Sequence, residues 1–401
     1  MKRLLWALAA ALLLLTGCQF YHKPSSTLQT VPYPSDTSAP TETEIPLITE
    51  APTETIEVTQ PTEPIFDPYR LMENMRTEEL VGQLFLARCP TGQQALNDLQ
   101  TYHLGGYILF GRDFEGQTPD SMTQIITSYQ QSAKIPMLIA VDEEGGTVCR
   151  VSNRTAFREK RFPSPRKLYD AGGMELLLQT EAEKAQLLHS LGINVNMAPV
   201  CDITTDSKAF MYSRSLGQDP ETTGQCIAAM AQAMHQESVG SVLKHFPGYG
   251  NNTDTHVGIV TDSRSLDELE NNDLLPFRAG IEAGAGAVLV SHTIIECLDA
   301  ELPASLSPSV ITYLRDSMGF DGVIVTDDLV MQAITDRYGD GEAAVLAVLA
   351  GNDLLCSSEY AIQYAAVLDA VTSGRISEEH LKTAVARILQ WKYELGLVPI
   401  L

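Results

Sequence analysis

Residues 241–258, Ser-Val-Leu-Lys-His-Phe-Pro-Gly-Tyr-Gly-Asn-Asn-Thr-Asp-Thr-His-Val-Gly, form the stretch around which the chain is organised. An apolar start runs into Lys244 and His245, and a Pro-Gly-Tyr-Gly turn then ends the strand and opens a loop that carries Asp254 and His256. A strand that ends in charge, followed by a glycine-rich loop with His beside a carboxylate, is typical of a proton-transfer site in an α/β enzyme. A strand-end salt bridge followed by an ordinary polar turn is the alternative.

Short apolar runs of this kind recur along the chain, each followed by an amphipathic stretch. The runs are residues 80–87, 106–110, 136–142, 194–200, 242–246, 287–292, 323–327 and 353–356. Helical patterns lie between them, for example at 174–191, 220–236, 265–283 and 342–350. Nearly continuous apolar runs are expected of parallel strands covered on both faces. Eight such units over about 335 residues predict an α/β fold, a (β/α)8 TIM barrel. A doubly wound sheet is the alternative, but the glycine-rich fingerprint that it would want after its first strand is missing.

Polar residues follow several of these runs at the same end. They are Asp142, Asp202, Lys244, His245, His292, Asp327 and Asp328. Barrel enzymes carry their chemistry at the carboxyl ends of the strands, so this registry predicts an enzyme. Because side chains alternate along a strand, Asp327 and Asp328 should point to opposite sides, and periodicity does not say which faces the barrel mouth. The sequence contains no H-x-H or H-E-x-x-H spacing, so we expect neither a metal nor another cofactor.

The N-terminal part of the chain predicts export. Residues 1–18 combine a basic start, an apolar run too short to span a bilayer comfortably, and Leu-Thr-Gly-Cys ending at Cys18. This ending resembles a bacterial lipobox, which implies a lipoprotein signal peptide, lipidation of Cys18 and a protein anchored to the cell membrane on its outer side. An uncleaved anchor and a plain secretory signal are the alternatives. Residues 19–65, rich in Pro, Thr, Ser and Glu, predict a disordered linker, which leaves 66–401 as a single catalytic domain.

The net charge and the cysteine spacing indicate which partners and cross-links to expect. The formal net charge of −24 argues against nucleic acid as a partner. Beyond Cys18, six cysteines are scattered without C-x-x-C or metal-type spacing, and no disulfide is predicted. Cys149, Cys201 and Cys356 lie in or beside apolar strand patterns, which predicts buried thiols.

Two arginines admit two interpretations each. Asp142 and Arg150, separated by a double-glycine turn, could hold neighbouring hydroxyls of a sugar through charge-assisted hydrogen bonds. As a buried ion pair they could simply lock the loop. The same two interpretations apply to Arg214 in Ser-Arg-Ser-Leu-Gly, residues 213–217.

Seven motifs in order carry a family resemblance. They are Val-Asp-x-Glu-Gly-Gly, Met-Ala-Pro-Val-x-Asp (197–202), Ser-Arg-Ser-Leu-Gly-x-Asp-Pro (213–220), Lys-His-Phe-Pro-Gly, Asp-Thr-His, Pro-Ala-Ser-Leu-Ser (303–307) and Thr-Asp-Asp-Leu-x-Met (326–331). Together they resemble glycoside hydrolase family 3, specifically its single-domain β-N-acetylhexosaminidases, over essentially all of residues 66–401.

The resemblance implies a retaining mechanism in which Asp327 attacks the anomeric carbon. His256 would be the acid/base and Asp254 would orient it, because an imidazole near its unperturbed pKa can protonate the leaving oxygen and later take a proton from water. Most glycosidases use two carboxylates instead. By the same matching, the residues that bind the terminal N-acetylglucosamine are Asp142, Arg150, Arg214, Lys244 and His245.

Three departures from the family pattern concern the loops. Tyr249 stands where the family usually has a second histidine, Thr147 stands where an arginine is common, and the segment from Lys244 to His256 looks one residue shorter than usual.

The implied function is a lipid-anchored exo-β-N-acetylglucosaminidase acting on peptidoglycan fragments or related amino sugars. A phosphorylase is one alternative, because a histidine in place of a carboxylate permits phosphate to approach. A non-catalytic carbohydrate-binding lipoprotein is another, because a fold alone never guarantees activity.

Overall fold

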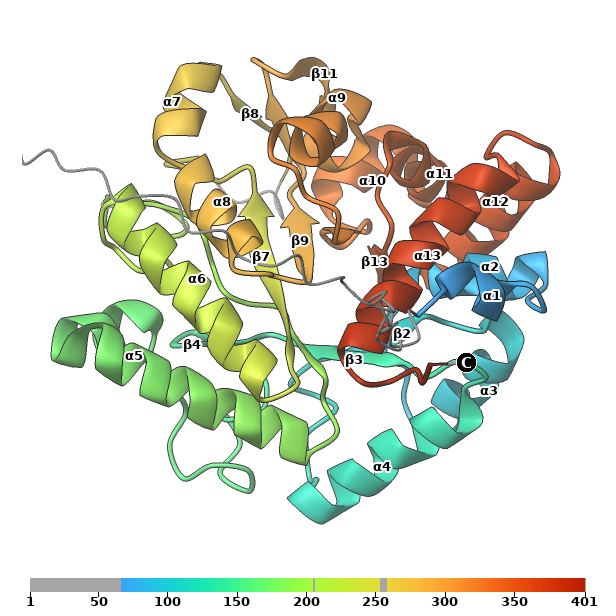
Figure 1. Ribbon diagram of the computed structural model, residues 1–401, viewed down its shortest axis with the longest axis horizontal. Helices are drawn as coiled ribbons and strands as arrows, with labels where there is room; N and C mark the ends of the chain where they lie inside the picture. Colours follow the sequence, from blue (N-terminus) through green and yellow to red (C-terminus); the bar gives the residue numbers. More distant parts are fainter. Residues whose placement is uncertain (1–65, 205, 253–257, 401) are drawn as a thin grey trace, which may run out of the picture. The chain divides into compact units, whose positions relative to one another are not determined.

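The computed structural model describes residues 66–204, 206–252 and 258–400. Within them, eight parallel strands lie in chain order around one sheet. They are β1 (Phe85–Arg88), β2 (Gly106–Leu109), β3 (Leu138–Val141), β6 (Val195–Asn196), β7 (Gly240–Phe246), β9 (Ala287–Val290), β12 (Val323–Thr326) and β13 (Leu355–Ser357). β13 pairs with β1, and a bridge between Val325 and Leu354 joins it to β12. The ring of strands is therefore nearly closed, and the (β/α)8 prediction is confirmed (Figure 1).

Burial explains why the strands read as continuous apolar runs. Every residue of β2, β3, β7, β9 and β12 is buried. One face of each strand fills the barrel interior and the other packs beneath the helices, so neither face can be polar along its length. The exceptions are the polar residues at the carboxyl ends, and these belong to the site.

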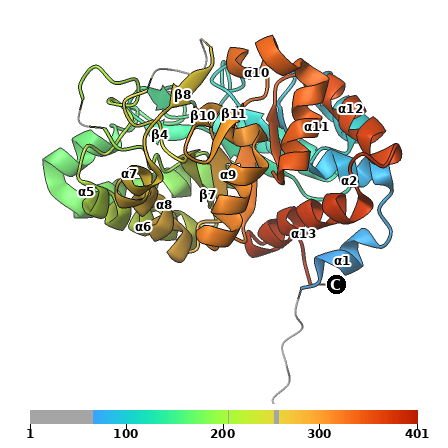
Figure 2. The ribbon, with the colours of Figure 1, turned by 90° about the horizontal axis from the view of Figure 1, so that it is seen from above.

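Helices surround the strands in both ribbon views (Figures 1 and 2). They are α1 (Pro68–Met72), α2 (Thr77–Gln83), α3 (Gln93–Tyr102), α4 (Pro119–Ser132), α5 (Pro165–Ser190), α6 (Pro220–Gln236), α7 (Leu266–Asn271), α8 (Leu274–Glu282), α9 (Pro308–Thr312), α10 (Gln332–Tyr338), α11 (Asp340–Ala350), α12 (Tyr360–Thr372) and α13 (Glu378–Glu394), with short turns at η2 (Ala304–Leu306) and η3 (Tyr313–Ser317). α6 coincides with its expected range because Asp219 accepts the Thr222 N–H at 2.9 Å and a proline follows it.

Local chemistry moves three boundaries from their expected positions. The first apolar run begins inside α2, where Glu79 caps the helix by accepting the Arg76 N–H at 2.9 Å. The expected helix at 174–191 begins earlier, at Pro165, and kinks at Gly172 and Gly173. The expected helix at 265–283 is two helices, separated at Asn272, whose φ of −131° is not helical.

Two small sheets extend the loops that follow strands β3, β7 and β9. The hairpin of β4 (Glu143–Gly145) and β5 (Val148–Cys149) follows β3 directly. The three-stranded sheet of β8 (Val260–Asp262), β10 (Thr293–Ile295) and β11 (Asp299–Pro303) combines the connections after β7 and β9. Figure 2 shows these small strands on one side of the domain and α1 and α13 toward the other.

Two further features of the described residues bear on the sequence predictions. Cys149, Cys201 and Cys356 are buried free thiols, as expected, and so are Cys89 and Cys226, whereas Cys297 is exposed. No helix within the described ranges is long and apolar enough to cross a bilayer.

Candidate active site

A cavity of about 780 Å³ opens at the carboxyl ends of the barrel strands. Six of the eight residues that the sequence places in the site fall in the described part of the chain, and all six line this cavity. They are Asp142, Arg150, Arg214, Lys244, His245 and Asp327. Asp254 and His256 lie outside the described residues, as do Cys18, the predicted signal peptide and the predicted linker.

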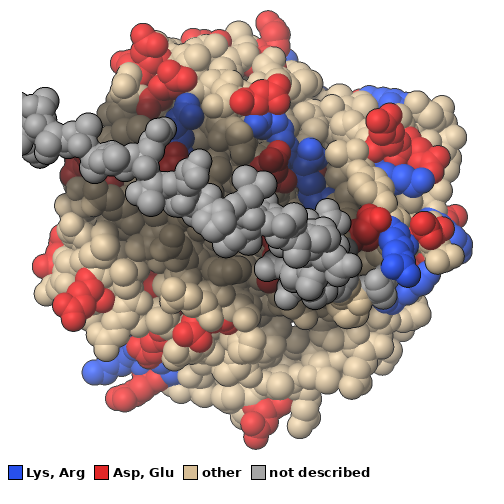
Figure 3. All heavy atoms as spheres, in the orientation of Figure 1, with Lys and Arg blue, Asp and Glu red and all other residues tan. Residues whose placement is uncertain are grey.

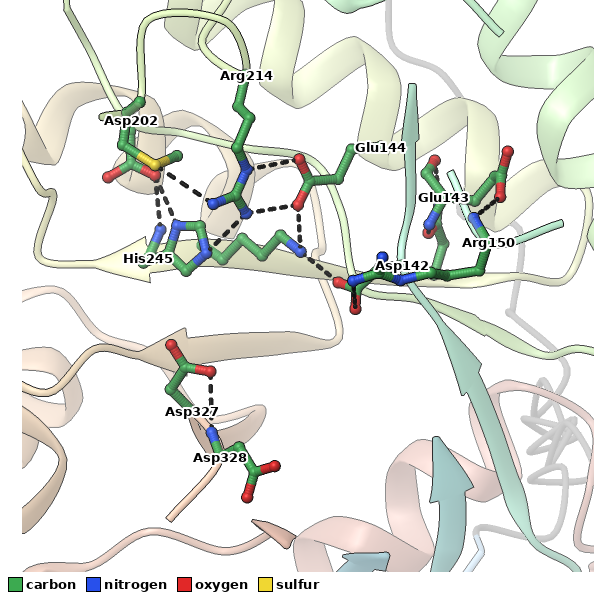
Figure 4. Close-up of polar contacts among 12 residues, drawn as sticks. Asp142, Glu143, Glu144, Arg150, Asp202, Arg214, His245, Asp327 and Asp328 are labelled. Atoms are coloured by element: carbon green, nitrogen blue, oxygen red, sulfur yellow. Dashed lines mark hydrogen bonds and ion pairs between the residues drawn. The ribbon is translucent and has the colours of Figure 1, made fainter. Parts of the chain in front are cut away.

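Lys244 is the centre of a buried ion-pair network. Its Nζ lies 2.7 Å from Asp142 Oδ1, at the end of β3, and 2.7 Å from Glu144 Oε1, in β4 (Figure 4). Burial on its own would lower the pKa of Lys244, but the two carboxylates outweigh it and raise this pKa above 10.5. The lysine is therefore a fixed cation inside the barrel mouth.

Glu144 is the residue that the sequence analysis overlooked. Its carboxylate accepts two hydrogen bonds from Arg214. The Nε of Arg214 lies 2.9 Å from Glu144 Oε2, and its Nη2 lies 2.6 Å from Glu144 Oε1. Burial on its own would raise the pKa of Glu144, but Lys244 and Arg214 together hold that pKa well below 4.5. The signal was available, because Glu144 is the glutamate of the Val-Asp-x-Glu-Gly-Gly motif quoted above. A motif alone does not reveal which cations its carboxylate reaches.

His245 is held on both ring nitrogens. Nδ1 lies 2.8 Å from Asp202 Oδ2, and Nε2 lies 3.1 Å from Arg214 Nη2. A guanidinium only donates, so Nε2 accepts and the ring proton sits on Nδ1, facing the aspartate. The imidazole is thereby oriented, with its Nε2 lone pair already occupied. It holds Arg214 in place and has no proton to give at that atom.

The loop after β7 packs onto this histidine. Tyr249 is buried, and its ring meets that of His245 edge-on at 5.3 Å between centroids. The Tyr249 N–H donates to Asp202 Oδ1 at 2.7 Å. Gly248 makes the turn with φ +116°, and a Cβ there would lie 2.7 Å from Asp273 Oδ1. The tyrosine that departs from the family pattern therefore forms part of the cavity wall.

Glu143 positions Arg150. The buried Glu143 carboxylate accepts the N–H groups of Arg150 at 2.8 Å and Val151 at 2.7 Å, and also the hydroxyl of Ser152. This holds the residues that follow β5, Arg150 among them, beside the cavity, where Arg150 Nη2 lies 3.7 Å from Asp142 Oδ2. Of the two interpretations given above for Asp142 and Arg150, the ion pair is present, but it is long and faces the open cavity.

Asp327 and Asp328 point to opposite sides, as the alternation predicted (Figure 4). The Asp328 carboxylate accepts the Ser358 N–H at 3.1 Å, the Ser358 hydroxyl at 2.5 Å and the Val330 N–H at 3.3 Å. Burial raises the pKa of Asp328. Its oxygens are thus occupied in tying the loop after β12 to the loop after β13. Asp327 turns toward the side of the cavity that carries His245 and Arg214.

Within the described residues, no group of three or more His, Cys, Asp or Glu side chains is arranged to hold a metal ion. His292, which follows β9, is engaged by Ser305 at 2.7 Å and by the Asp328 carbonyl at 3.0 Å.

The barrel carries carboxylates, an oriented histidine and fixed cations at its carboxyl-terminal mouth, which is the end where barrel enzymes hold their active sites. The family model "Glycosyl hydrolase family 3 N terminal domain" matches residues 76–391, and the chain therefore belongs to glycosyl hydrolase family 3. It is a glycosidase by this membership.

Three relatives illustrate the match. The chain is 32% identical to "Beta-hexosaminidase LpqI" of Mycobacterium tuberculosis, over 72% of this chain and 74% of that protein. It is 36% identical to a "Beta-hexosaminidase" of Tolumonas auensis, over 66% of this chain and 79% of that one. The solved structure of a glycoside hydrolase family 3 β-N-acetylglucosaminidase from Paenibacillus superposes with a TM-score of 0.76 at 34% identity, covering 80% of this chain and 63% of that chain.

Proposed function

We propose that this chain is a retaining exo-β-N-acetylglucosaminidase that releases terminal N-acetylglucosamine from peptidoglycan fragments or related amino sugars. The observation that carries the proposal is the placement of Asp327, which ends β12 and faces the cavity across from the network of Lys244, Glu144 and Arg214. The relatives named β-hexosaminidase and β-N-acetylglucosaminidase support the choice of sugar.

The chemistry begins with Asp327. One carboxylate oxygen attacks the anomeric carbon, the bond to the leaving oxygen breaks, and a glycosyl-aspartate ester forms. The leaving oxygen takes a proton as it departs. Water then attacks the same carbon, gives up a proton and displaces Asp327, so the configuration is retained.

His256, oriented by Asp254, is our proposal for the group that gives and takes this proton. The two described histidines beside the cavity support it by elimination. His245 has its Nε2 lone pair occupied by Arg214, and His292 is held by Ser305 and a backbone carbonyl. Neither has a free nitrogen for proton transfer.

The ion-pair network is suited to hold a neutral sugar. Asp142, Glu144 and Lys244 alternate in charge, so hydroxyls can donate to the carboxylates and accept from the ammonium. The pairs keep the groups in place before the substrate arrives, and binding therefore costs little reorganisation. Arg150, Arg214 and His245 complete the proposed binding set.

Export and anchoring remain part of the proposal. They rest on the basic and apolar start of the chain and on the lipobox-like ending at Cys18. A lipid at Cys18 and a linker over 19–65 would tether the enzyme outside the cell membrane, where cell-wall glycans occur. Labelling cells with a radioactive fatty acid, for the wild type and for Cys18→Ala, tests the anchor.

The activity is tested with 4-nitrophenyl N-acetyl-β-glucosaminide in phosphate-free buffer and in buffer with inorganic phosphate. Free N-acetylglucosamine in both is the expected product, with β-configuration in its first-formed anomer by NMR. Sugar 1-phosphate in the second buffer would favour the phosphorylase alternative, and no turnover in either would favour the non-catalytic one. Asp327→Asn should lower kcat by at least about 1,000-fold.

His256→Ala separates acid catalysis from binding. Loss of the acid should slow substrates with a poor leaving group much more than 4-nitrophenyl substrates, because only the former need a proton as the bond breaks. A series of aryl N-acetylglucosaminides with leaving groups of increasing pKa measures this as a steeper slope of log(kcat/KM). An unchanged slope would remove His256 from the acid role.

A further inference from the structure

Arg166, the second residue of α5, is a half-buried arginine that no step above uses. Its Nη2 donates to the Thr204 carbonyl at 3.0 Å and to the Ser215 hydroxyl at 2.9 Å. Both acceptors belong to the loop that runs from β6 to α6, and they are eleven positions apart in the chain. One guanidinium nitrogen therefore joins two distant points of this loop.

The guanidinium of Arg166 also packs on the loop. Its carbon lies 4.1 Å from the centre of the Tyr212 ring. A Cβ at Gly217 would lie 2.1 Å from the same carbon, and Gly217 has φ +79°. A side chain at position 217 would therefore displace the guanidinium as well as strain the backbone. Stacking on a ring fixes the orientation of the guanidinium, so its hydrogen bonds hold the loop at defined points.

The contacts of Arg166 depend on geometry more than on charge. Lys and Arg number 27 against 51 Asp and Glu in the chain, and acidic side chains are spread over the face seen in Figure 3. Carboxylate partners are plentiful, yet both hydrogen bonds of Arg166 Nη2 go to neutral oxygens. A planar guanidinium presents several donors at fixed angles, which suits it to tie two points of a loop together.

The loop that Arg166 holds carries three side chains of the cavity wall. Phe210, Ser213 and Arg214 all line the cavity. Arg214 directly precedes Ser215, whose hydroxyl Arg166 binds. The most strongly engaged side chain of this part of the cavity is therefore one residue away from the contact that Arg166 makes.

Arg214 depends on such contacts because its loop has little regular structure. Between β6 and α6 the described residues form no helix and one isolated bridge, at Val200. The Arg214 guanidinium nevertheless reaches Glu144 at 2.6 and 2.9 Å and His245 Nε2 at 3.1 Å. A binding group has to be placed to within about 0.5 Å to keep its productive geometry. The anchoring of the loop therefore decides whether Arg214 stays in register with the cavity.

We propose that Arg166 is a positioning residue for substrate binding, which fixes the loop after β6 so that Arg214 is held in place for the terminal sugar. The inference rests on the proposed function for the role of Arg214. It goes beyond that function because Arg166 is not among the residues that line the cavity and acts only through the loop. Arg214 would contact the sugar both before and during the reaction, so loss of Arg166 weakens binding more than chemistry.

Steady-state kinetics with 4-nitrophenyl N-acetyl-β-glucosaminide tests the inference on Arg166→Met, which keeps the length of the side chain and removes its donors. KM should rise by about 10-fold, and kcat should stay within about 3-fold of the wild type. A purely structural role gives the opposite result, because a smaller folded fraction lowers the apparent kcat and leaves KM unchanged. An unchanged KM would therefore overturn the inference.

The matched control is Arg278→Met. Arg278, in α8, also donates to one carbonyl and one hydroxyl, those of Ser317 at 3.5 Å and Tyr313 at 3.4 Å, but it is not among the residues that line the cavity. This variant should change neither constant. Thermal melting checks that each variant is folded. Arg166→Lys keeps the charge but has one nitrogen in place of the planar group, and it carries the comparison if Arg166→Met is unfolded, with KM raised by about 3- to 10-fold.

A double-mutant cycle shows whether the effect passes through Arg214. Arg214→Lys alone should raise KM by about 10-fold, because an ammonium cannot replace the two-pronged contact with Glu144. Adding Arg166→Met to Arg214→Lys should raise KM by less than about 2-fold more, since the side chain that Arg166 positions is already lost. A second rise of about 10-fold would mean that the two residues act independently, and this would overturn the inference.

Failure of the proposed function shows separately, as a wild type without turnover or as an Arg214→Lys variant with an unchanged KM. Hydrogen exchange measured by mass spectrometry on the free protein then decides the inference. Arg166→Lys should speed amide exchange in peptides from residues 204–217 by about 10-fold and leave peptides from α13 unchanged. Equal exchange over 204–217 in the wild type and the variant would overturn it.

Discussion

Asp202 holds His245 by both its backbone and its ring. Asp202 Oδ2 accepts the His245 N–H at 3.1 Å and lies 2.8 Å from its Nδ1, while Oδ1 accepts the Tyr249 N–H at 2.7 Å. The aspartate is 1% exposed. One buried carboxylate thus orients the imidazole and fixes the start of the loop after β7.

Asp202→Asn should damage both stability and binding. The Asn side chain has an NH₂ group in place of one carboxylate oxygen, and this group cannot accept a hydrogen bond. At least one N–H donor of the cluster therefore loses its acceptor, which lowers the free energy of unfolding by about 1–3 kcal/mol. The freed ring no longer holds Arg214, and we expect KM for an aryl N-acetylglucosaminide to rise by about 10-fold. Urea unfolding and steady-state kinetics measure the two effects. Asp219→Asn, at the exposed N-cap of α6, is the control and should change neither, because Asn caps a helix as well as Asp does.

Asp327 and Asp328 should respond very differently to the same substitution. In Asp328→Asn the amide oxygen can still accept the backbone N–H groups of Ser358 and Val330, and the amide N–H can donate to the Ser358 hydroxyl. We expect a stability loss of about 1 kcal/mol or less and kcat within a few-fold of the wild type. Asp327→Asn should lose at least about 1,000-fold in kcat with little change in stability. Similar losses of kcat in both would contradict the assignment of Asp327 alone as nucleophile.

Glu144→Gln should be strongly destabilising at neutral pH. It removes the charge shared by Lys244 and Arg214 and leaves two buried cations with one carboxylate, which typically costs about 3–5 kcal/mol. Because folding holds the pKa of Glu144 below 4.5, its stabilisation is complete above that pH and is lost as the pH falls further. Urea unfolding from pH 7 down to pH 3 should show the wild type and the variant converge. A difference that stays constant with pH would refute this account.

Lys392, in α13, should make the free energy of unfolding depend on pH above pH 7. Its Nζ is buried and donates to Gln83 Oε1 at 2.7 Å, and burial lowers its pKa from 10.5 to about 7. Between these values the unfolded chain binds a proton that the folded chain does not, so stability rises with pH in this window and the penalty is greatest below pH 7.

Comparison with Lys392→Met isolates that effect. From pH 7 to pH 9 the wild type should gain on the variant by up to about 1.4 kcal/mol per pH unit. Urea unfolding at several pH values in this range measures the gain. Lys382→Met, on the exposed face of the same helix, should show no such change with pH. A flat difference for Lys392→Met would mean that the lysine stays protonated in the folded chain over the whole range.

The eight strands and their order could be predicted from the sequence, because a strand buried on both faces needs a continuous apolar run. The polar residues that end those runs, such as Asp142 and Asp327, were also predictable, since the carboxyl ends of barrel strands share one face. Helix boundaries were less predictable where a cap or a glycine pair decided them, as at Glu79 and Gly173.

Only the tertiary structure decided which charges meet. Glu144 and Lys244 are a hundred positions apart in the chain, and their 2.7 Å contact depends on how the β4 hairpin folds back over the barrel. Both Asp327 and Asp328 line the cavity, and only the structure shows that Ser358, a residue of a different loop, occupies the carboxylate of Asp328. Hydrophobic periodicity encodes burial along one strand, whereas ion pairs depend on where separate strands end in space.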